Sequence, residues 1–515
     1  MDTVGKVFYK VITIITSVVL GWVILTYLSQ GLEIVPTLLL FVIFISLVIV
    51  ACLLYRQRYL KLSQWLKKRW SKVNSAQVLR IALVIALIIG IAVRLSFLAL
   101  GSRYGLQEDS LSDNGIHWYY APALANGEEI QPTEGIYEAF FPHLMTYSAT
   151  LAGFMKIFGT NYNAVLFSNL IFDLVTVIVI YFLLKQWRGQ TSARLGAIFW
   201  LLNPLEILFC GCSLSIVVTN MWLAITLLLS YFAIRALRQP CWWKILLVMV
   251  GFGSSIGIGN AYRPIFTVIL IAFALVLAYE VLRRGKTLLI PAIISLLLVA
   301  CTSIGCGKLI NLGHQAINPY AVSGSVGVGW NFFIGANYDT NGHWSREDSA
   351  LLGPLLYGQS AEETDVVAIQ QHFLEMTIDR YKAMGSIKLL PHLLNKSVTL
   401  FADDSETITW PVVSGFQLSD HNPAYLAAHS LGVIMFFVCI VLTFVYCLSI
   451  FWRPSGAGKW HFDTYTLFLM LCLCGIIAIS LMVEVMRRYT MPLLVIFVIF
   501  AAIQLTRKTS KVIHA

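Results

Sequence analysis

Two aspartates in one loop between apolar segments are the residues of this sequence best suited to proton transfer. The loop covers residues 103–143, and it carries Asp109 and, just before an aromatic run, Asp113. A carboxylate at the dry edge of a membrane has a raised pKa because it loses water, and a raised pKa makes it a stronger base. Either aspartate could therefore take a proton from a group held at the membrane surface.

Asp113 also has a structural interpretation. It precedes a stretch that we expect to be helical, residues 116–126, and an aspartate in front of a helix accepts hydrogen bonds from free backbone N–H groups. One residue can serve both purposes. The sequence favours Asp113 as the base, with Asp109 as the alternative, and leaves the choice between them open.

Arginines at the ends of two apolar runs could bind a phosphate. Arg263 stands beside Pro264, where a charge costs little and a lipid phosphate lies within reach, although snorkelling to headgroups explains this arginine equally well. Arg487 and Arg488 adjoin another run. Neighbouring residues of a helix point in different directions, so we expect at most one of these two to face a cavity.

Other polar and aromatic side chains have two interpretations each. His117 and Trp118 could line a sugar pocket, but an aromatic belt at the membrane interface accounts for them almost as well. Asp173 and Glu206 occur within apolar runs, where we expect them to pair structurally with other polar groups.

The composition requires elements that span a membrane. Hydrophobic residues make up 58% of the 515 residues and charged residues only 12%, which is more apolar than soluble folds are. Apolar runs recur at the length of about 20 residues that a membrane helix needs, whereas the short alternating segments of a barrel are missing. The sequence therefore predicts an all-α polytopic protein with about twelve spans. We expect them near residues 11–30, 35–55, 79–100, 162–185, 194–210, 214–235, 243–262, 265–282, 287–306, 428–451, 464–483 and 489–506.

The basic residues predict the orientation of the chain. The connection 56–80 carries only basic charges, so we place it in the cytoplasm, and alternation of the spans places both termini there too. The loop 101–161 and the polar segment 312–427 then lie outside. The net charge of +10 is explained by cytoplasmic rims that face the anionic lipid bilayer, so nucleic acid is not an expected partner.

Four regions follow from this arrangement. They are residues 1–78 with two spans and a basic connection, 79–311 as the membrane core with the loop 101–161, 312–427 as an extracytoplasmic domain, and 428–515 as the last spans and a basic tail. In the extracytoplasmic domain, helical spacing of apolar residues predicts helices at 362–383 and 389–401. Its Gly-rich and aromatic part, residues 323–341, is typical of loop and short extended structure.

Several short motifs follow one another on the expected outer side. They are Asp113 with the aromatic and Ala-rich run 118–127, Phe141-Pro142-His143, residues 154–159, Asn203-Pro204-Leu205-Glu206, Tyr262-Arg263-Pro264, Gly335-Ala336-Asn337, Gly342-His343-Trp344 and residues 484–489. In this order they resemble the GT-C integral-membrane glycosyltransferases, specifically bacterial members similar to protein O-mannosyltransferases and aminoarabinose transferases. The resemblance covers residues 79–506, and the two earlier spans are an addition to the usual core.

The resemblance implies an activity and a place for it. A member of this group carries amphipathic juxtamembrane helices and a small extracytoplasmic domain, in a bacterial cytoplasmic membrane. It would move a sugar from a polyprenyl-phosphate donor to a glycan, teichoic acid, lipid or protein acceptor of the cell envelope, by one inverting displacement. A donor with a single phosphate requires no cofactor. The sequence shows no metal-ligand cluster and leaves a divalent metal open.

The resemblance also implies roles for particular residues. Asp113 or Asp109 would be the catalytic base, and the family's Arg-Tyr pair favours Arg488 with Tyr489 over Arg487 as a substrate contact. Lys396 is similar to a position in the outer domain of relatives, although surface helices often carry a lysine. The chain departs from the family at residues 141–143, because relatives tend to have Lys-Pro-Pro there. The phosphate contact of that lysine does not transfer to Phe141, and His143 is its partial substitute.

Two other classes of membrane protein compete with this interpretation. A transporter or lipid flippase also has about twelve spans, but it usually divides into matching halves with ionisable residues near the midplane. A membrane polysaccharide polymerase or acyltransferase would need a nucleophile with a histidine, and no such pair stands out. Charges gathered on one face favour the glycosyltransferase.

Overall fold

The computed structural model describes residues 2–28, 75–104, 113–237, 242–322, 326–358, 360, 363–402, 423–451 and 463–506. Every regular element in these ranges is a helix, which confirms the predicted all-α class. The span predicted at 35–55 lies outside the described ranges, as does Asp109.

Nine helices of the described residues are long and apolar enough to cross a membrane. They lie in α1 (Asp2–Leu28), α3 (Ser75–Tyr104), α7 (Tyr162–Arg188), α10 (Ile216–Ala236), α11 (Trp242–Tyr262), α13 (Leu289–Ile317), α18 (Pro423–Phe451), α19 (Thr464–Met482), and η3 (Arg487–Thr490) with α20 (Met491–Thr506). The polytopic class is confirmed, whereas the count of twelve is not.

Two predicted spans have a different form. The span at 194–210 is divided into α8 (Gln190–Leu201) and α9 (Pro204–Phe209), because Pro204 has no N–H and the Asn203 side chain caps the new helix. The span at 265–282 corresponds to α12 (Thr267–Arg284), which is followed by the short η1 (Lys286–Leu288). Helix α12 has only 18 residues, and three of them, Glu280, Arg283 and Arg284, are charged.

The bundle is built around α20. All residues from Met491 to Ile503 are buried, and a helix that is apolar on every side belongs inside a bundle. A buried ion pair links α3 to α7: Arg94 Nε lies 2.7 Å from Asp173 Oδ2, and the indole N–H of Trp200 in α8 donates to Asp173 Oδ1. Asn220 donates to Glu206 over 2.9 Å. The prediction that Asp173 and Glu206 pair structurally is confirmed.

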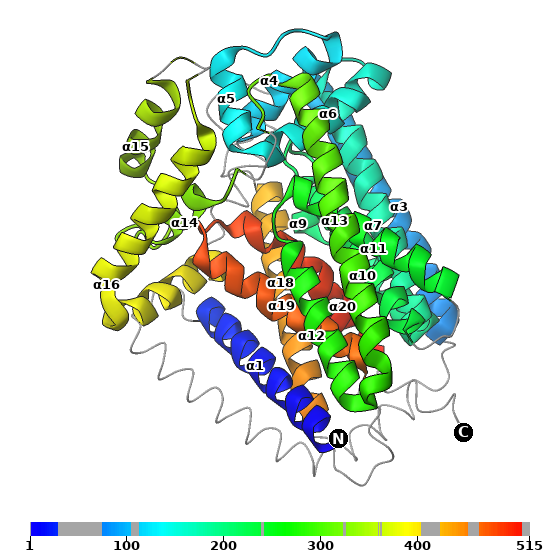
Figure 1. Cartoon of the computed structure of the whole chain (residues 1–515). Helices are drawn as coiled ribbons and strands as arrows, with labels where there is room; N and C mark the ends of the chain where they lie inside the picture. The colour runs from blue at the N-terminus through cyan, green and yellow to red at the C-terminus, as the bar shows by residue number, and fades with distance from the viewer. Residues whose placement is uncertain are drawn as a thin grey trace.

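Six further helices form what we call the cap: α4 (Asp113–Asn126), α5 (Pro132–Phe140), α6 (Pro142–Phe158), α14 (Gly329–Gly335), α15 (Arg346–Tyr357) and α16 (Val366–Ala402). In Figure 1, α4, α5 and α6 gather at the end of the bundle opposite the N-terminal end of α1, and α14, α15 and α16 flank it. Apolar side chains of α5, α14, α15 and α16 form a second, smaller core.

The outer segment is more helical than predicted. Residues 329–335 were expected to be loop or extended structure, but they form α14, whose Trp330 N–H donates to the Gln370 side chain and whose Trp330 and Phe333 rings pack on Phe373. The two helices predicted at 362–383 and 389–401 are confirmed as the two parts of α16. They meet at Gly385, where a φ of 66° favours glycine.

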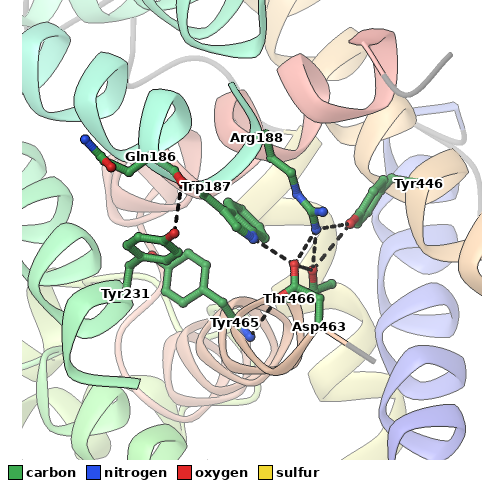
Figure 2. A network of polar contacts seen from close by, with 8 residues as sticks. All are labelled: Gln186, Trp187, Arg188, Tyr231, Tyr446, Asp463, Tyr465 and Thr466. Carbon is green, nitrogen blue, oxygen red and sulfur yellow. Dashed lines mark hydrogen bonds and ion pairs between the residues drawn. The ribbon is translucent and has the colours of Figure 1, made fainter. Parts of the chain in front are cut away.

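A polar network ties three helices together at the other end of the bundle (Figure 2). Asp463, the N-cap of α19, accepts hydrogen bonds from the Trp187 indole at 2.7 Å and from the Arg188 guanidinium, both at the end of α7. Arg188 also donates to Thr466 and to Tyr446 of α18. The network therefore holds the C-terminal end of α7 against α18 and the N-terminal start of α19.

Candidate active site

Helix α6 connects the parts of the candidate site through three polar side chains. The Thr150 hydroxyl lies 2.7 Å from the Tyr262 hydroxyl of α11, and the Ser148 hydroxyl lies 3.0 Å from His117 Nδ1 of α4. The Thr146 hydroxyl makes the same kind of contact, 3.0 Å, to a histidine of α13. The Thr150 contact fixes α6 against α11, the helix that ends just before Arg263, and the other two contacts join α6 to α4 and α13.

The predicted pocket residues of α4 lie within helix packing. His117 is 1% exposed, and its ring packs edge-on against Tyr147 of α6 with centroids 4.7 Å apart. The Trp118 ring packs against Tyr162 of α7 at 5.6 Å. His143 lies at the second position of α6, where its ring is 6.1 Å from that of Phe141. Of these residues, His143 lies nearest to the N-terminus of its helix.

Asp113 is the first residue of α4, so the helix expected after it is present. Helix α4 packs closely on α6, and this packing puts the start of α4 in the cap. The base therefore stays a prediction for both aspartates, because the Asp113 side chain and all of Asp109 lie outside the described part of the structure.

Two arginines contact one tyrosine ring. The guanidinium carbon of Arg263, just after α11, lies 4.9 Å from the centre of the Tyr489 ring, and that of Arg488 lies 5.7 Å from it. Each contact is a cation–π interaction. The Tyr489 hydroxyl donates to Glu484 over 3.1 Å, which sets the plane of the ring. Two cations that share a ring create a positive field that suits a phosphate.

Arg487 takes a different direction from Arg488. Its guanidinium carbon lies 4.3 Å from the centre of the Phe436 ring of α18, it donates to the Thr490 hydroxyl, and it is 1% exposed. The neighbouring arginines thus diverge, as expected, and Arg488 is the one that shares Tyr489 with Arg263.

Lys396 lies where three sequence motifs meet. Its ammonium donates to the carbonyl of Gly335 over 2.6 Å and to that of Val483 over 2.8 Å, and the side chain is fully buried. The backbone N–H of Val485 donates to the carbonyl of Gly342 over 2.9 Å. Burial lowers the pKa of Lys396 to about 7, although the negative charge of Glu484 opposes that shift.

Sequence reasoning missed two buried carboxylates, of which only Glu484 contacts residues of the candidate site. Glu484 was quoted only as the start of a motif, yet it joins Tyr489 and faces Lys396. Glu138 of α5 is fully buried beside the cap core. Its signal in the sequence is an acid on an otherwise apolar helical face, next to Ala139 and Phe140. Within the described ranges, no three His, Cys, Asp or Glu side chains group as a metal site.

Comparisons with known proteins agree with the motifs. Residues 143–304 match the family model described as dolichyl-phosphate-mannose-protein mannosyltransferase. This match covers less than half of the 515 residues, runs from the start of α6 into α13, and contains Arg263. No curated protein matches the sequence.

Two solved structures share a low similarity with this chain. The crystal structure of ArnT from Cupriavidus metallidurans bound to undecaprenyl phosphate is 12% identical, with 83% of this chain and 77% of that chain covered and a TM-score of 0.31. The apo structure of the same protein is 14% identical, with 83% and 76% covered and a TM-score of 0.31. Scores of this size show no detailed correspondence between the folds. Over residues 143–304, this membrane protein is similar to the dolichyl-phosphate-mannose-protein mannosyltransferases, as its motifs predicted.

Proposed function

We propose that this protein is a membrane glycosyltransferase that takes a sugar from a polyprenyl-phosphate donor and transfers it to a cell-envelope acceptor. The observation that carries the proposal is that Arg263 and Arg488, from distant segments, both contact the ring of Tyr489. The match to a family named for a polyprenyl-phosphate sugar, over the residues that contain Arg263, supports the same donor class.

The arginines hold the phosphate of the donor and stabilise the charge that develops on it as the sugar leaves. Guanidinium groups suit this task because their N–H groups match phosphate oxygens in pairs. The lipid tail of the donor stays in the bilayer, so its phosphate lies at the end of the spans, at the depth of residues that follow α11 and α19.

A carboxylate takes the proton of the acceptor hydroxyl as that oxygen attacks the anomeric carbon. Asp113 at the start of α4 is the base, and Asp109 is the alternative. One displacement by the acceptor inverts the anomeric centre. The reaction takes place on the extracytoplasmic face, and the termini are cytoplasmic, because the short basic connections belong inside.

The test measures sugar transfer by membranes that contain the protein or one of its variants, with radiolabelled polyprenyl-phosphate sugars as donors. Asp113→Asn should lower the rate by about 10² to 10⁴ if Asp113 is the base, and Asp109→Asn should do so if the base is Asp109. Glu128→Gln is the matched control, because Glu128 is an exposed acid just after α4. Transfer that is unaffected by both aspartate variants, or absent from the wild type with every donor, would overturn the proposal.

A further inference from the structure

Lys396 completes the ends of two helices. Gly335 is the last residue of α14 and Val483 is the C-cap of α19, and the Lys396 ammonium donates to both of their carbonyls. Carbonyls at helix C-termini lack partners within the helix, and positive charge is favourable there. One side chain of α16 thus joins two helix ends that are distant in the sequence.

The surroundings of Lys396 are shaped for close contact between backbones. A Cβ atom on Gly335 would lie 2.5 Å from the carbonyl carbon of Val483, and a Cβ on Gly342 would lie 2.8 Å from Lys396 Cε. His392, one turn before Lys396 on α16, contacts the Gly335 carbonyl through Nε2 at 2.9 Å. Only residues without a side chain leave room for this arrangement.

The segment after α19 is held by the same junction. Glu484 N–H donates to the Asn331 carbonyl over 2.8 Å, and Val485 N–H donates to the Gly342 carbonyl over 2.9 Å. Three residues later the chain reaches Arg488 and Tyr489. The position of residues 483–485 therefore determines where the cation and the ring lie.

The part of α16 that carries Lys396 is also held by α1. The indole N–H of Trp22 in α1 donates to the Ser397 hydroxyl over 2.5 Å. Helix α1 packs against α16, α18 and α19, so it supports the helix that presents the lysine. Because Lys396 is buried and its helix is held by α1, its side chain is not placed to contact a substrate.

We propose that Lys396 is a positioning residue that joins α16 to residues 483–485 and so fixes Arg488 and Tyr489 for the donor phosphate. The inference rests on the proposed function for the identity of the ligand. It differs from a direct substrate contact, because both acceptors of Lys396 are backbone carbonyls and the side chain has no exposed surface.

The experiment compares Lys396→Met with Lys388→Met, a matched control at an exposed lysine on the same part of α16. Hydrogen exchange of the peptide that contains residues 483–488 is measured on the purified protein without ligand. The thermal stabilisation of each variant by undecaprenyl phosphate is measured beside it. In Lys396→Met we expect exchange at 484 and 485 to speed up at least tenfold, while α20 stays protected, and we expect the affinity for undecaprenyl phosphate to fall about tenfold.

The outcomes separate this inference from the proposed function. Unchanged exchange at 484 and 485 in a folded Lys396→Met protein would overturn the positioning role. If undecaprenyl phosphate fails to stabilise even the wild type, the proposed donor is wrong, and the exchange result still decides the role of Lys396. Lys396→Gln keeps an N–H donor, and it replaces Lys396→Met in the exchange measurement if the methionine variant does not fold. Its exchange should be intermediate, and exchange equal to wild type would count against the inference.

Discussion

The site combines residues whose types suggested chemistry with residues that only the fold brings into play. Arg263, Arg488 and Tyr489 come from segments more than 200 residues apart and meet at one ring. Arg487 has the same chemical groups as Arg488, but the ring of Phe436 holds it. The direction of the side chain, rather than its chemical type, separates the two.

The Tyr489 ring should matter more than its hydroxyl. Tyr489→Ala removes both cation–π contacts, each worth about 0.5–1 kcal/mol, so affinity for undecaprenyl phosphate should fall about fivefold. Tyr489→Phe keeps the ring and loses only the bond to Glu484, so most of the affinity should remain. Thermal shift titrations with undecaprenyl phosphate measure both. Equal losses in the two variants would contradict the assigned role of the ring.

At the scale of elements, polar side chains at helix ends fix how the helices of the bundle lie against one another. Asp463 caps α19 and binds the side chains of Trp187 and Arg188 of α7 (Figure 2). Lys396 joins the C-terminal ends of α14 and α19. Helix α19 is thus fixed at both ends by side chains from other helices.

Loss of the Asp463 side chain should destabilise the bundle. Asp463→Ala removes an N-cap and an ion pair with Arg188, which together are worth about 1–2 kcal/mol. Thermal unfolding in detergent should show a lower Tm. Asp379→Ala is the matched control, because Asp379 pairs with Lys382 on the exposed surface of α16 and should leave Tm unchanged. Similar shifts in both variants would argue against a special role for the network.

Lys396 should make stability depend on pH. The unfolded chain keeps the Lys396 proton up to an ordinary pKa of about 10.4, whereas the folded protein releases it near pH 7 because the side chain is buried. Between these values the unfolded state binds more protons, so the free energy of unfolding rises with pH. Glu484 and His392 are the titratable groups that face the lysine.

Lys396→Met provides the reference for that dependence, because methionine does not titrate. Between pH 7 and pH 9, the Tm of the wild type should rise relative to that of the variant, and below pH 6 the difference should be constant. Parallel Tm curves for the two proteins from pH 6 to pH 9 would contradict the lowered pKa.

At the scale of the whole molecule, the bundle is apolar almost throughout and therefore depends on its few buried charges. The pair of Arg94 and Asp173 connects α3 to α7, and its side chains are 1% and 0% exposed. A buried pair of this kind is costly to break, because removal of one partner leaves the other charge uncompensated.

A double-mutant cycle tests this dependence. Asp173→Leu should lower the free energy of unfolding by about 3–5 kcal/mol, because it strands the Arg94 charge. Arg94→Leu combined with Asp173→Leu should recover most of that loss. Denaturant unfolding of the purified variants measures the cycle. A double variant less stable than either single variant would show that the pair contributes more than mutual compensation.

The sequence alone determined the class of this protein. Long apolar runs can only be satisfied as membrane helices, and local sequence defined both parts of α16, because helical periodicity is a local property. The motifs also gave the family resemblance that residues 143–304 bear out. The prediction missed the break at Asn203, although Pro204 is visible in the sequence, and it missed the helix α14, which depends on packing against Phe373.

Tertiary structure decided which residues belong together. No spacing places Lys396 on the carbonyls of Gly335 and Val483, or Arg263 on the ring of Tyr489, because those contacts join segments whose separation in sequence carries no information about distance. The sequence supplied the cations and the carboxylates. Packing of α16, α14 and α19 supplied the geometry, because burial of apolar faces is the dominant favourable term in folding and sets where these helices lie.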